Sequence, residues 1–283
     1  MIKPAEIRYL SAQDGSAATL WQLIGLPYDG ASSYRRGAQE GPAQIRKASD
    51  SIETFSPYCH RDLEDLRFAD LGDLEIIGAS PEAVLQQVQI FYNEKARRET
   101  RLLGLGGDHA VTIGAIQGLV DAGVKPHVLH LDAHLDLRDE YDGTRYSHAC
   151  VARRLAEIVG HERLVQWGMR SGERAEFDWA RQQMTFQGRD VLSLDKALRR
   201  LKGHPVYMTL DLDVFDPAEL PGVGNPEPGG MKFSNFLSLL QQLRELEIIG
   251  ADVVELAPNW DPSGRSSVMA AEIIRELLLT MVK

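Results

Sequence analysis

Four apolar segments of the sequence end in acidic or imidazole side chains. They run from Leu103 to His109, from Val128 to Asp136, from Val206 to Asp213 and from Asp252 to Glu255. Short apolar runs of this kind are typical of buried strands, and stretches with helical spacing separate them. Such alternation predicts a parallel sheet covered by helices on both faces. Because ligands of these sheets bind beyond the carboxyl ends of the strands, we expect the four polar ends to meet in one crevice.

The same patterns predict the positions of most elements. Strands are expected at 20–24, 101–105, 127–131, 163–167, 205–210 and 248–254. Helices are expected at 42–49, 81–99, 110–122, 148–159, 233–246 and 267–282. No linker, repeat or low-complexity tract interrupts the sequence, so residues 1–283 are predicted to form one domain, with residues 1–19 as an N-terminal arm.

Composition limits the partners of the chain. Its formal net charge of -10 disfavours nucleic acid, which is bound through clustered Lys and Arg. No stretch is apolar enough to span a bilayer, and charged residues interrupt the N-terminus, which excludes a signal peptide there. The chain has only 2 cysteines, as expected in a reducing compartment. We therefore expect a cytoplasmic protein that binds neither nucleic acid nor membrane.

The spacing of residues within the polar ends indicates a metal site. Asp132, His134 and Asp136 lie two positions apart, as do Asp211 and Asp213. In extended backbone, alternate side chains point to the same side, so each set is able to face one point. Taken singly, such motifs also occur as turns and helix caps. Burying so many carboxylates together, however, is costly without a cation.

His109 completes this set, because it follows the turn Gly106-Gly107 at the end of another expected strand. The six side chains are four carboxylates and two imidazoles, and two divalent cations would balance the four negative charges. All donors are oxygen or nitrogen, with no thiolate, which favours manganese over a structural zinc.

Three of these segments resemble the signature motifs of the ureohydrolase (arginase/agmatinase) family, most of all the bacterial agmatinases. The segments are 106–110, 131–136 and 209–217, with further likeness at 25–29, 36–37, 41–42, 221–222 and 229–230. The likeness therefore covers nearly the whole chain. It implies a three-layer α/β/α fold around a mostly parallel, eight-stranded sheet, two manganese ions per chain, and a trimeric or hexameric homo-oligomer.

The resemblance also assigns a role to each metal ligand. His109 and Asp136 would bind one ion, His134 and Asp213 the other, and Asp132 and Asp211 would bridge the two. The activity it implies is hydrolysis of a guanidino compound to urea and an amine. A pair of divalent ions generates a nucleophile from water near neutral pH, which suits this reaction.

Other residues acquire roles from the resemblance alone. Glu255 would bind the guanidinium group, His148 would transfer protons, and Asp136 would assist the departing amine. Each has a structural alternative, since Glu255 would also suit an exposed strand end and His148 follows a probable capping serine. Asp108 is interpreted as a residue that complements a helix dipole. The remaining histidines match no signature and are interpreted as structural or surface residues: His60, His127, His130, His161 and His204.

The segment between Asp136 and His148 bears on the substrate. It lacks the Ser/Asn-rich stretch with which arginases hold the α-carboxylate of arginine. Asp139, Glu140 and Asp142 are instead predicted to bind a cationic tail. This pattern favours agmatine as the substrate and putrescine, a polyamine precursor, as the product.

Several alternatives stay open. Arg138 and Arg145 keep guanidino acids such as guanidinobutyrate and guanidinopropionate among the candidates, and Trp260 would suit a longer substrate such as aminopropylagmatine. Asn225 stands where a threonine is common in the family, which leaves the substrate preference open. Arginine and formimidoylglutamate also stay among the alternatives. The complete ligand set disfavours a single-metal amidohydrolase of the deacetylase type and a non-catalytic binding homologue.

Overall fold

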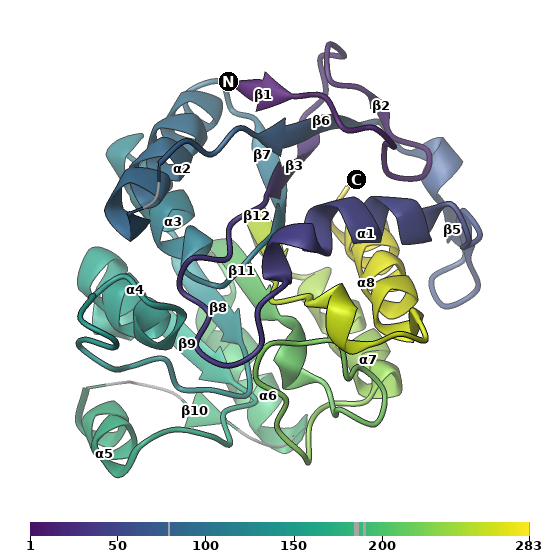
Figure 1. Cartoon of the computed structure of the whole chain (residues 1–283). Helices are drawn as coiled ribbons and strands as arrows, with labels where there is room; N and C mark the ends of the chain where they lie inside the picture. The colour runs from purple at the N-terminus through teal and green to yellow at the C-terminus, as the bar shows by residue number, and fades with distance from the viewer. Residues whose placement is uncertain (79, 184–186, 189–190, 283) are drawn as a thin grey trace.

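The computed structural model describes residues 1–78, 80–183, 187–188 and 191–282. Its centre is a twisted sheet of parallel strands that lies between two layers of helices (Figure 1). In sheet order the parallel strands are β6 (Phe68–Leu74), β3 (Trp21–Leu26), β7 (Arg101–Gly106), β12 (Glu247–Val254), β11 (Pro205–Asp211), β8 (His127–Leu131), β9 (Leu164–Trp167) and β10 (Gln187–Gly188). The predicted three-layer α/β/α fold is confirmed.

Two short strands extend the sheet beyond the eight that were predicted. β1 (Ile2–Lys3) pairs antiparallel with β6, and β2 (Gln13–Asp14) pairs parallel with it. Both lie within residues 1–19, so the predicted arm runs along this edge of the sheet. Between them, Tyr9 is buried and its hydroxyl donates to the carbonyl oxygen of Ala271 at 2.7 Å.

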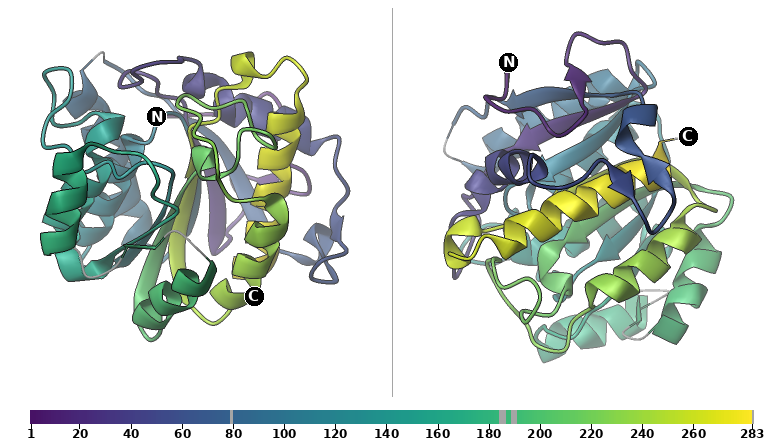
Figure 2. Two further views of the ribbon diagram at one scale, coloured as in Figure 1. Left: turned by 90° about the horizontal axis from the view of Figure 1, so that it is seen from below. Right: turned by 90° about the vertical axis from the view of Figure 1, so that its right-hand side faces the viewer.

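Each face of the sheet is covered by its own group of helices (Figure 2). Buried side chains of α1, α6, α7 and α8 pack in one core cluster, and those of α2, α3, α4 and α5 pack in the other. The helices are α1 (Gly41–Ser49), α2 (Pro81–Ala96), α3 (Val111–Asp121), α4 (Val151–Val159), α5 (Arg174–Gln183), α6 (Val191–Leu201), α7 (Phe233–Leu243) and α8 (Arg265–Met281). Throughout the described ranges, every helix is too short or too polar to cross a membrane.

The four polar strand ends belong to neighbours in the sheet. β7, β12, β11 and β8 lie side by side in this order and are all parallel, so their carboxyl ends share one edge. The turn after β7 needs glycine, because a Cβ at Gly107 would lie only 1.8 Å from the carbonyl oxygen of Tyr28. The loop after β3 therefore packs directly against this edge, as predicted for a site built from strand ends.

Candidate metal centre and substrate cavity

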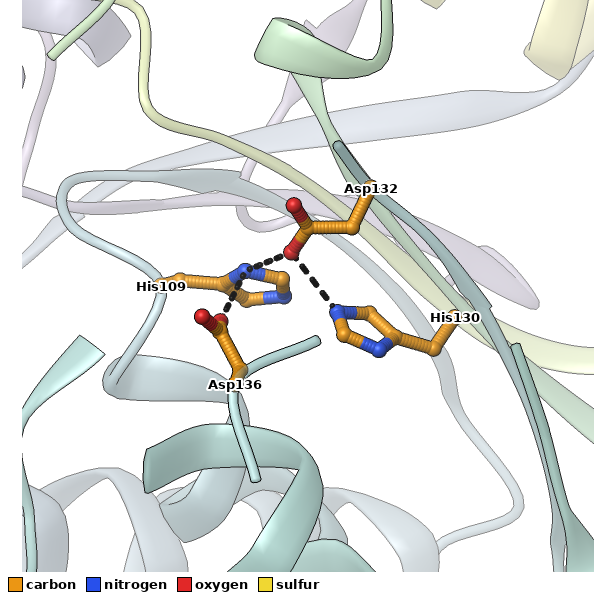
Figure 3. Close-up of side chains that lie close together, drawn as sticks. All are labelled: His109, His130, Asp132 and Asp136. Atoms are coloured by element: carbon orange, nitrogen blue, oxygen red, sulfur yellow. Dashed lines mark hydrogen bonds and ion pairs between the residues drawn. The ribbon is translucent and has the colours of Figure 1, made fainter. Parts of the chain in front are cut away.

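The predicted ligands converge around His109, which follows β7. Its Nδ1 atom lies 3.1 Å from Asp132 Oδ2, 3.2 Å from Asp211 Oδ2 and 3.6 Å from Asp136 Oδ2. Figure 3 shows the side chains of His109, Asp132 and Asp136 pointing toward one another. One imidazole and three carboxylates thus face a single point at the sheet edge.

His134 forms the second half of the cluster. Its Nδ1 atom lies 2.8 Å from Asp213 Oδ2 and 3.5 Å from Asp132 Oδ1. Asp132 directs one oxygen toward His109 and the other toward His134. The structure therefore brings all six predicted ligands together, with Asp132 between the two histidines.

The hydrogen bonds of His109 determine which of its ring nitrogens faces the carboxylates. Its Nε2 atom lies 2.9 Å from the hydroxyl of Thr209, which donates its own hydrogen to Asp252 at 2.6 Å. Thr209 therefore accepts from Nε2–H, and the Nδ1 lone pair of a neutral ring faces three carboxylates. Within the described chain, Nδ1 forms no hydrogen bond. A divalent cation among these atoms would satisfy both the nitrogen and the carboxylates.

The electrostatics of the cluster lead to the same conclusion. Burial opposes the charge of His109, yet Asp132 and Asp211 outweigh it and hold the pKa of the imidazole well above its ordinary value. Burial and the neighbouring carboxylates also raise the pKa of Asp136 and Asp211. Among the described residues, no lysine or arginine forms an ion pair with these carboxylates. Histidines are the cationic partners that the described chain offers these carboxylates, an arrangement compatible with a metal site.

Glu255 lies at the same edge, immediately after β12. Its Oε1 atom accepts the backbone N–H of His109 at 2.7 Å, and its own N–H donates to Gly107 at 2.9 Å. Its φ of 68° lies in the left-handed region, which costs a residue with a side chain about 1–3 kcal/mol. Burial, with the charges of Asp211 and Asp108, raises its pKa well above normal. Such strain persists where the surroundings hold a side chain in place, as at functional sites.

His148, at the start of the 3-10 helix η3 (His148–Cys150), also faces this region. Its Nδ1 atom is hydrogen-bonded to the carbonyl oxygen of Ala31, and its Nε2 atom lies 3.1 Å from Ser33 Oγ. A carbonyl only accepts, so the neutral ring carries its proton on Nδ1 and leaves Nε2 as the basic atom. Burial lowers the pKa of His148, which favours this neutral form.

Asp108 does more than the helix-dipole interpretation suggested. Its Oδ2 atom accepts the N–H of Ala31 at 2.8 Å, and its Oδ1 atom accepts that of Ala110 at 3.1 Å. Burial raises its pKa to about 7. Because Ala31 also binds His148, Asp108 connects the turn after β7 to the loop that orients this histidine.

A cavity of about 550 Å³ opens beside the cluster. The ligands His134 and Asp136 line it together with His148. Its other charged lining residues are Arg35, Arg138, Glu173, Glu176 and Glu227. A larger cavity of about 760 Å³ contains none of the ligands and lies beside the amino ends of β3, β7 and β12. The smaller cavity is therefore the candidate substrate site.

Of the loop that carries the three predicted acids, Arg138 and Tyr141 line this cavity. Among the described lining residues there is no Asp139, Glu140 or Asp142. Asp139 is held by Arg154 at 2.6 Å and by Arg145 at 3.0 Å, while Glu140 and Asp142 are exposed. The role of these acids in binding a cationic tail stays a prediction, and the pairing of Asp139 with Arg154 on α4 lies outside the local pattern on which it depended.

His130 is the residue that the sequence motifs missed. It is fully buried on β8, and its Nε2 atom lies 2.8 Å from Asp132 Oδ2 (Figure 3). The two-residue spacing of Asp132 and His134, continued one step backward, leads to His130. Strand periodicity was therefore the sequence feature that pointed to His130, since none of the three signature segments includes this position.

Fold and cluster together define an α/β protein with a group of histidines and aspartates, compatible with a metal site, at the carboxyl edge of its sheet. A sequence model of the arginase family matches residues 20–280. The agmatinase of Bacillus subtilis (strain 168) is 37% identical over 265 residues, which cover 92% of this chain and 91% of that protein. The chain belongs to the arginase family, as its motifs predicted.

Two further relatives extend this comparison. The N(1)-aminopropylagmatine ureohydrolase of Thermococcus kodakarensis is 36% identical over 83% of this chain and 82% of that protein. Among solved structures, the agmatine ureohydrolase of Thermoplasma volcanium matches with a TM-score of 0.88 and 32% identity, covering 97% of this chain and 94% of that one. Both likenesses extend over most of the chain.

Proposed function

We propose that the chain hydrolyses agmatine to urea and putrescine at a centre of two manganese ions. The observation that carries this proposal is the cluster of six side chains with oxygen and nitrogen donors. Asp132, Asp136 and Asp211 face Nδ1 of His109, and Asp132 and Asp213 face Nδ1 of His134. The relatives named agmatinase and agmatine ureohydrolase support agmatine as the substrate.

The ligands divide into three pairs. His109 and Asp136 would hold one ion, His134 and Asp213 the other, and Asp132 and Asp211 would contact both. Carboxylate and imidazole donors without thiolate suit manganese. When bound, such a pair lowers the pKa of water and so supplies a nucleophile near neutral pH.

Glu255 is proposed to bind the guanidinium group. Its Oε1 atom is occupied by the N–H of His109, whereas Oε2 accepts no hydrogen bond from the described residues. A Cβ at Gly224 would lie 3.1 Å from Oε2, so glycine there leaves this oxygen open to approach. A buried carboxylate forms strong, charge-assisted hydrogen bonds with guanidinium N–H groups. Glu255 would thereby orient the guanidinium carbon toward the cluster.

His148 is proposed to move the proton that the leaving amine needs. Ala31 holds the proton of the neutral ring on Nδ1, so Nε2 accepts a proton during attack and delivers it to the amine. Ser33, which lies 3.1 Å from Nε2, keeps the ring in place between these events. Asp136 lines the same cavity and would assist at the departing nitrogen.

Glu227 is the best acceptor for the terminal ammonium of agmatine. Glu173 and Glu176 are partly neutralised by Arg138, at 3.3 Å and 3.6 Å. Glu227 accepts a hydrogen bond from Ser171 at 2.9 Å, and within the described ranges it forms no ion pair with a lysine or arginine. Its carboxylate therefore has unused acceptor capacity in the cavity.

Arg35 favours a second candidate, a guanidino acid such as guanidinobutyrate. It lines the cavity, and its guanidinium carbon stacks over the rings of Tyr34 at 5.2 Å and Trp260 at 4.9 Å. In the described part of the chain it forms no ion pair, so its charge is free to bind a carboxylate. Trp260 packs on Arg35 and does not appear among the described lining residues, which weakens its proposed stacking on a longer polyamine.

The decisive experiment measures urea release by the manganese-loaded chain from agmatine, arginine, aminopropylagmatine, guanidinobutyrate, guanidinopropionate and formimidoylglutamate, with formamide followed for the last. We expect agmatine to have the highest kcat/KM, and Glu227→Gln to raise its KM about tenfold through loss of one charged hydrogen bond. Asp139→Asn, outside the cavity, serves as the control and should leave KM unchanged. Preference for a guanidino acid would indicate that Arg35 binds the carboxylate of the substrate. Absence of urea release from every substrate would refute the proposal.

The cytoplasmic location, the role in polyamine biosynthesis and the trimeric or hexameric homo-oligomer stay predictions that accompany this function.

A further inference from the structure

Two polar residues that no signature motif contains lie behind Asp132. His130 on β8 and Gln166 on β9 are directly opposite each other in the sheet, and both are fully buried. His130 Nε2 lies 2.8 Å from Asp132 Oδ2, and His130 Nδ1 lies 3.0 Å from Gln166 Nε2. Figure 3 shows the imidazole of His130 turned toward the carboxylate of Asp132.

The orientation of Gln166 determines which nitrogen of His130 carries the proton. Gln166 Nε2 also lies 2.8 Å from the carbonyl oxygen of Leu135, which only accepts hydrogen bonds. Turning the amide over would place Oε1 against that carbonyl oxygen, so the NH2 group must face it. Its second hydrogen then points to His130, whose Nδ1 accepts. The neutral ring therefore carries its proton on Nε2 and donates it to Asp132.

This tautomer excludes His130 from direct binding of a cation through Nε2, because that atom has no lone pair to offer. The bond does, however, restrain Asp132, whose other oxygen accepts the backbone N–H of His134 at 2.6 Å. Each oxygen of this carboxylate is thus held by one N–H of the chain. Gln166 adds a further restraint, since its bond to Leu135 fixes the backbone just before Asp136.

We propose that His130 and Gln166 are a positioning pair that fixes the carboxylate of Asp132 for binding of the two ions. The inference rests on the proposed metal centre and adds two residues to it. Neither side chain touches substrate. Their contribution is to metal affinity, because a carboxylate already held in its binding orientation loses less freedom when the ions bind.

The test compares two substitutions of His130 with a control on the same strand. His130→Leu removes the donor, whereas His130→Gln keeps an N–H at the same number of bonds from the backbone. His127→Leu is the control, because His127 is only partly buried and stacks on His204 at the other end of β8. Manganese affinity and stoichiometry are measured by calorimetric titration of the metal-free proteins, and their folding by circular dichroism.

We expect His130→Leu to weaken manganese binding about 10- to 100-fold, the usual effect of losing a partner behind a metal ligand. His130→Gln should retain most of the affinity, His127→Leu all of it, and Gln166→Leu should fall in between. At saturating manganese, the KM for substrate should stay unchanged. If His130→Leu does not fold, the manganese affinities of His130→Gln and Gln166→Leu still test the proposal. Of these two variants, only Gln166→Leu should bind manganese clearly more weakly than the wild type.

Three results would overturn the proposal. If the wild type and His130→Leu bound manganese with equal affinity, His130 and Gln166 would have no role in metal binding, and the proposed function would stay intact. Equal loss in His130→Gln and His130→Leu would make His130 a ligand itself. Failure of the wild-type chain to bind manganese would refute the metal centre and the pair with it.

Discussion

Two groups of carboxylates in this chain differ in the partners that surround them. In the first, Arg46 donates from Nε and Nη2 to the two oxygens of Asp70 at 2.8 and 2.9 Å, and from Nη1 to Asp73 at 2.6 Å. Asp70 also accepts the backbone N–H groups of Tyr9 and Gly72. We call these three charged residues the Arg46 cluster. A guanidinium that the chain itself supplies offsets part of its negative charge.

The second group, the Asp132 cluster, consists of the six proposed ligands His109, Asp132, His134, Asp136, Asp211 and Asp213. Its only cationic partners in the described chain are histidines. Burying carboxylates removes their hydration and so destabilises the fold. Ions bound from solution would offset this cost. The contrast teaches that the source of the compensating charge, rather than the number of acids, separates a structural cluster from a binding site.

The largest expected effect comes from breaking the Asp132 cluster. Asp132→Ala removes the one carboxylate that faces both histidines, so manganese content should fall from two ions per chain to fewer than one. Urea release should drop by on the order of a thousandfold, or about 4 kcal/mol of transition-state stabilisation. Metal analysis and the urea assay measure both, with the exposed Asp139→Ala as the control. Normal turnover without Asp132 would show that the cluster is not the catalytic centre.

Breaking the Arg46 cluster should instead cost stability. Arg46→Met keeps the length of the side chain but leaves Asp70 buried and unpaired, which typically destabilises a fold by about 3–5 kcal/mol. Urea-induced unfolding would measure this, while manganese affinity of the folded protein should not change. The control is Arg8→Met, whose partner Asp14 is exposed, so its loss should leave stability almost unchanged. A fully stable Arg46→Met variant would contradict the structural role.

The two clusters also differ in how far the sequence predicts them. The Asp132 cluster is visible in the sequence because its members repeat every second residue at the ends of apolar strands. The strand β6 was missed, since Asp70, Gly72 and Asp73 make its sequence look like a turn. Only the pairing with Arg46, which is 24 residues away from Asp70, makes these acids compatible with a buried strand. Local patterns do not contain such partners.

The same limit applies at the site. The acids of the loop after Asp136 looked free in the sequence, but Asp139 is paired with Arg154 on α4. His130 looked structural because its contact with Gln166 depends on the register of β8 against β9. The proposed ligands, which strand periodicity places, lie together in the structure as predicted. The contacts of Asp139 and His130 involve distant elements, and the local sequence did not predict them.

The smallest expected effect is the change in stability when one aspartate of the Asp132 cluster is replaced by asparagine. This change also separates the two clusters most clearly, because the same replacement in the Arg46 cluster should change stability in the opposite direction. In metal-free protein, Asp211→Asn keeps an oxygen to accept the N–H of Asp213, which lies 2.8 Å away, and places an amide donor beside the free Nδ1 of His109. It should therefore leave stability unchanged or raise it by about 0.5–1 kcal/mol, as replacements at binding sites often do. Asp70→Asn should lower stability by about 3 kcal/mol, because its amide would meet an N–H or a guanidinium whichever way it turned.

Chemical unfolding after removal of metal with a chelator measures both changes, and adding manganese provides the second half of the comparison. Manganese at one hundred times its Kd should stabilise the wild type by about 2.7 kcal/mol, whereas Asp211→Asn, which lacks a bridging ligand, should gain much less. On addition of manganese, the wild type would then become more stable than Asp211→Asn. Asp70→Asn, whose metal ligands are intact, would gain as much stability from manganese as the wild type does. If Asp211→Asn destabilised the metal-free protein as much as Asp70→Asn does, the carboxylates of the Asp132 cluster would be satisfied within the fold, and the distinction between the two clusters would be lost.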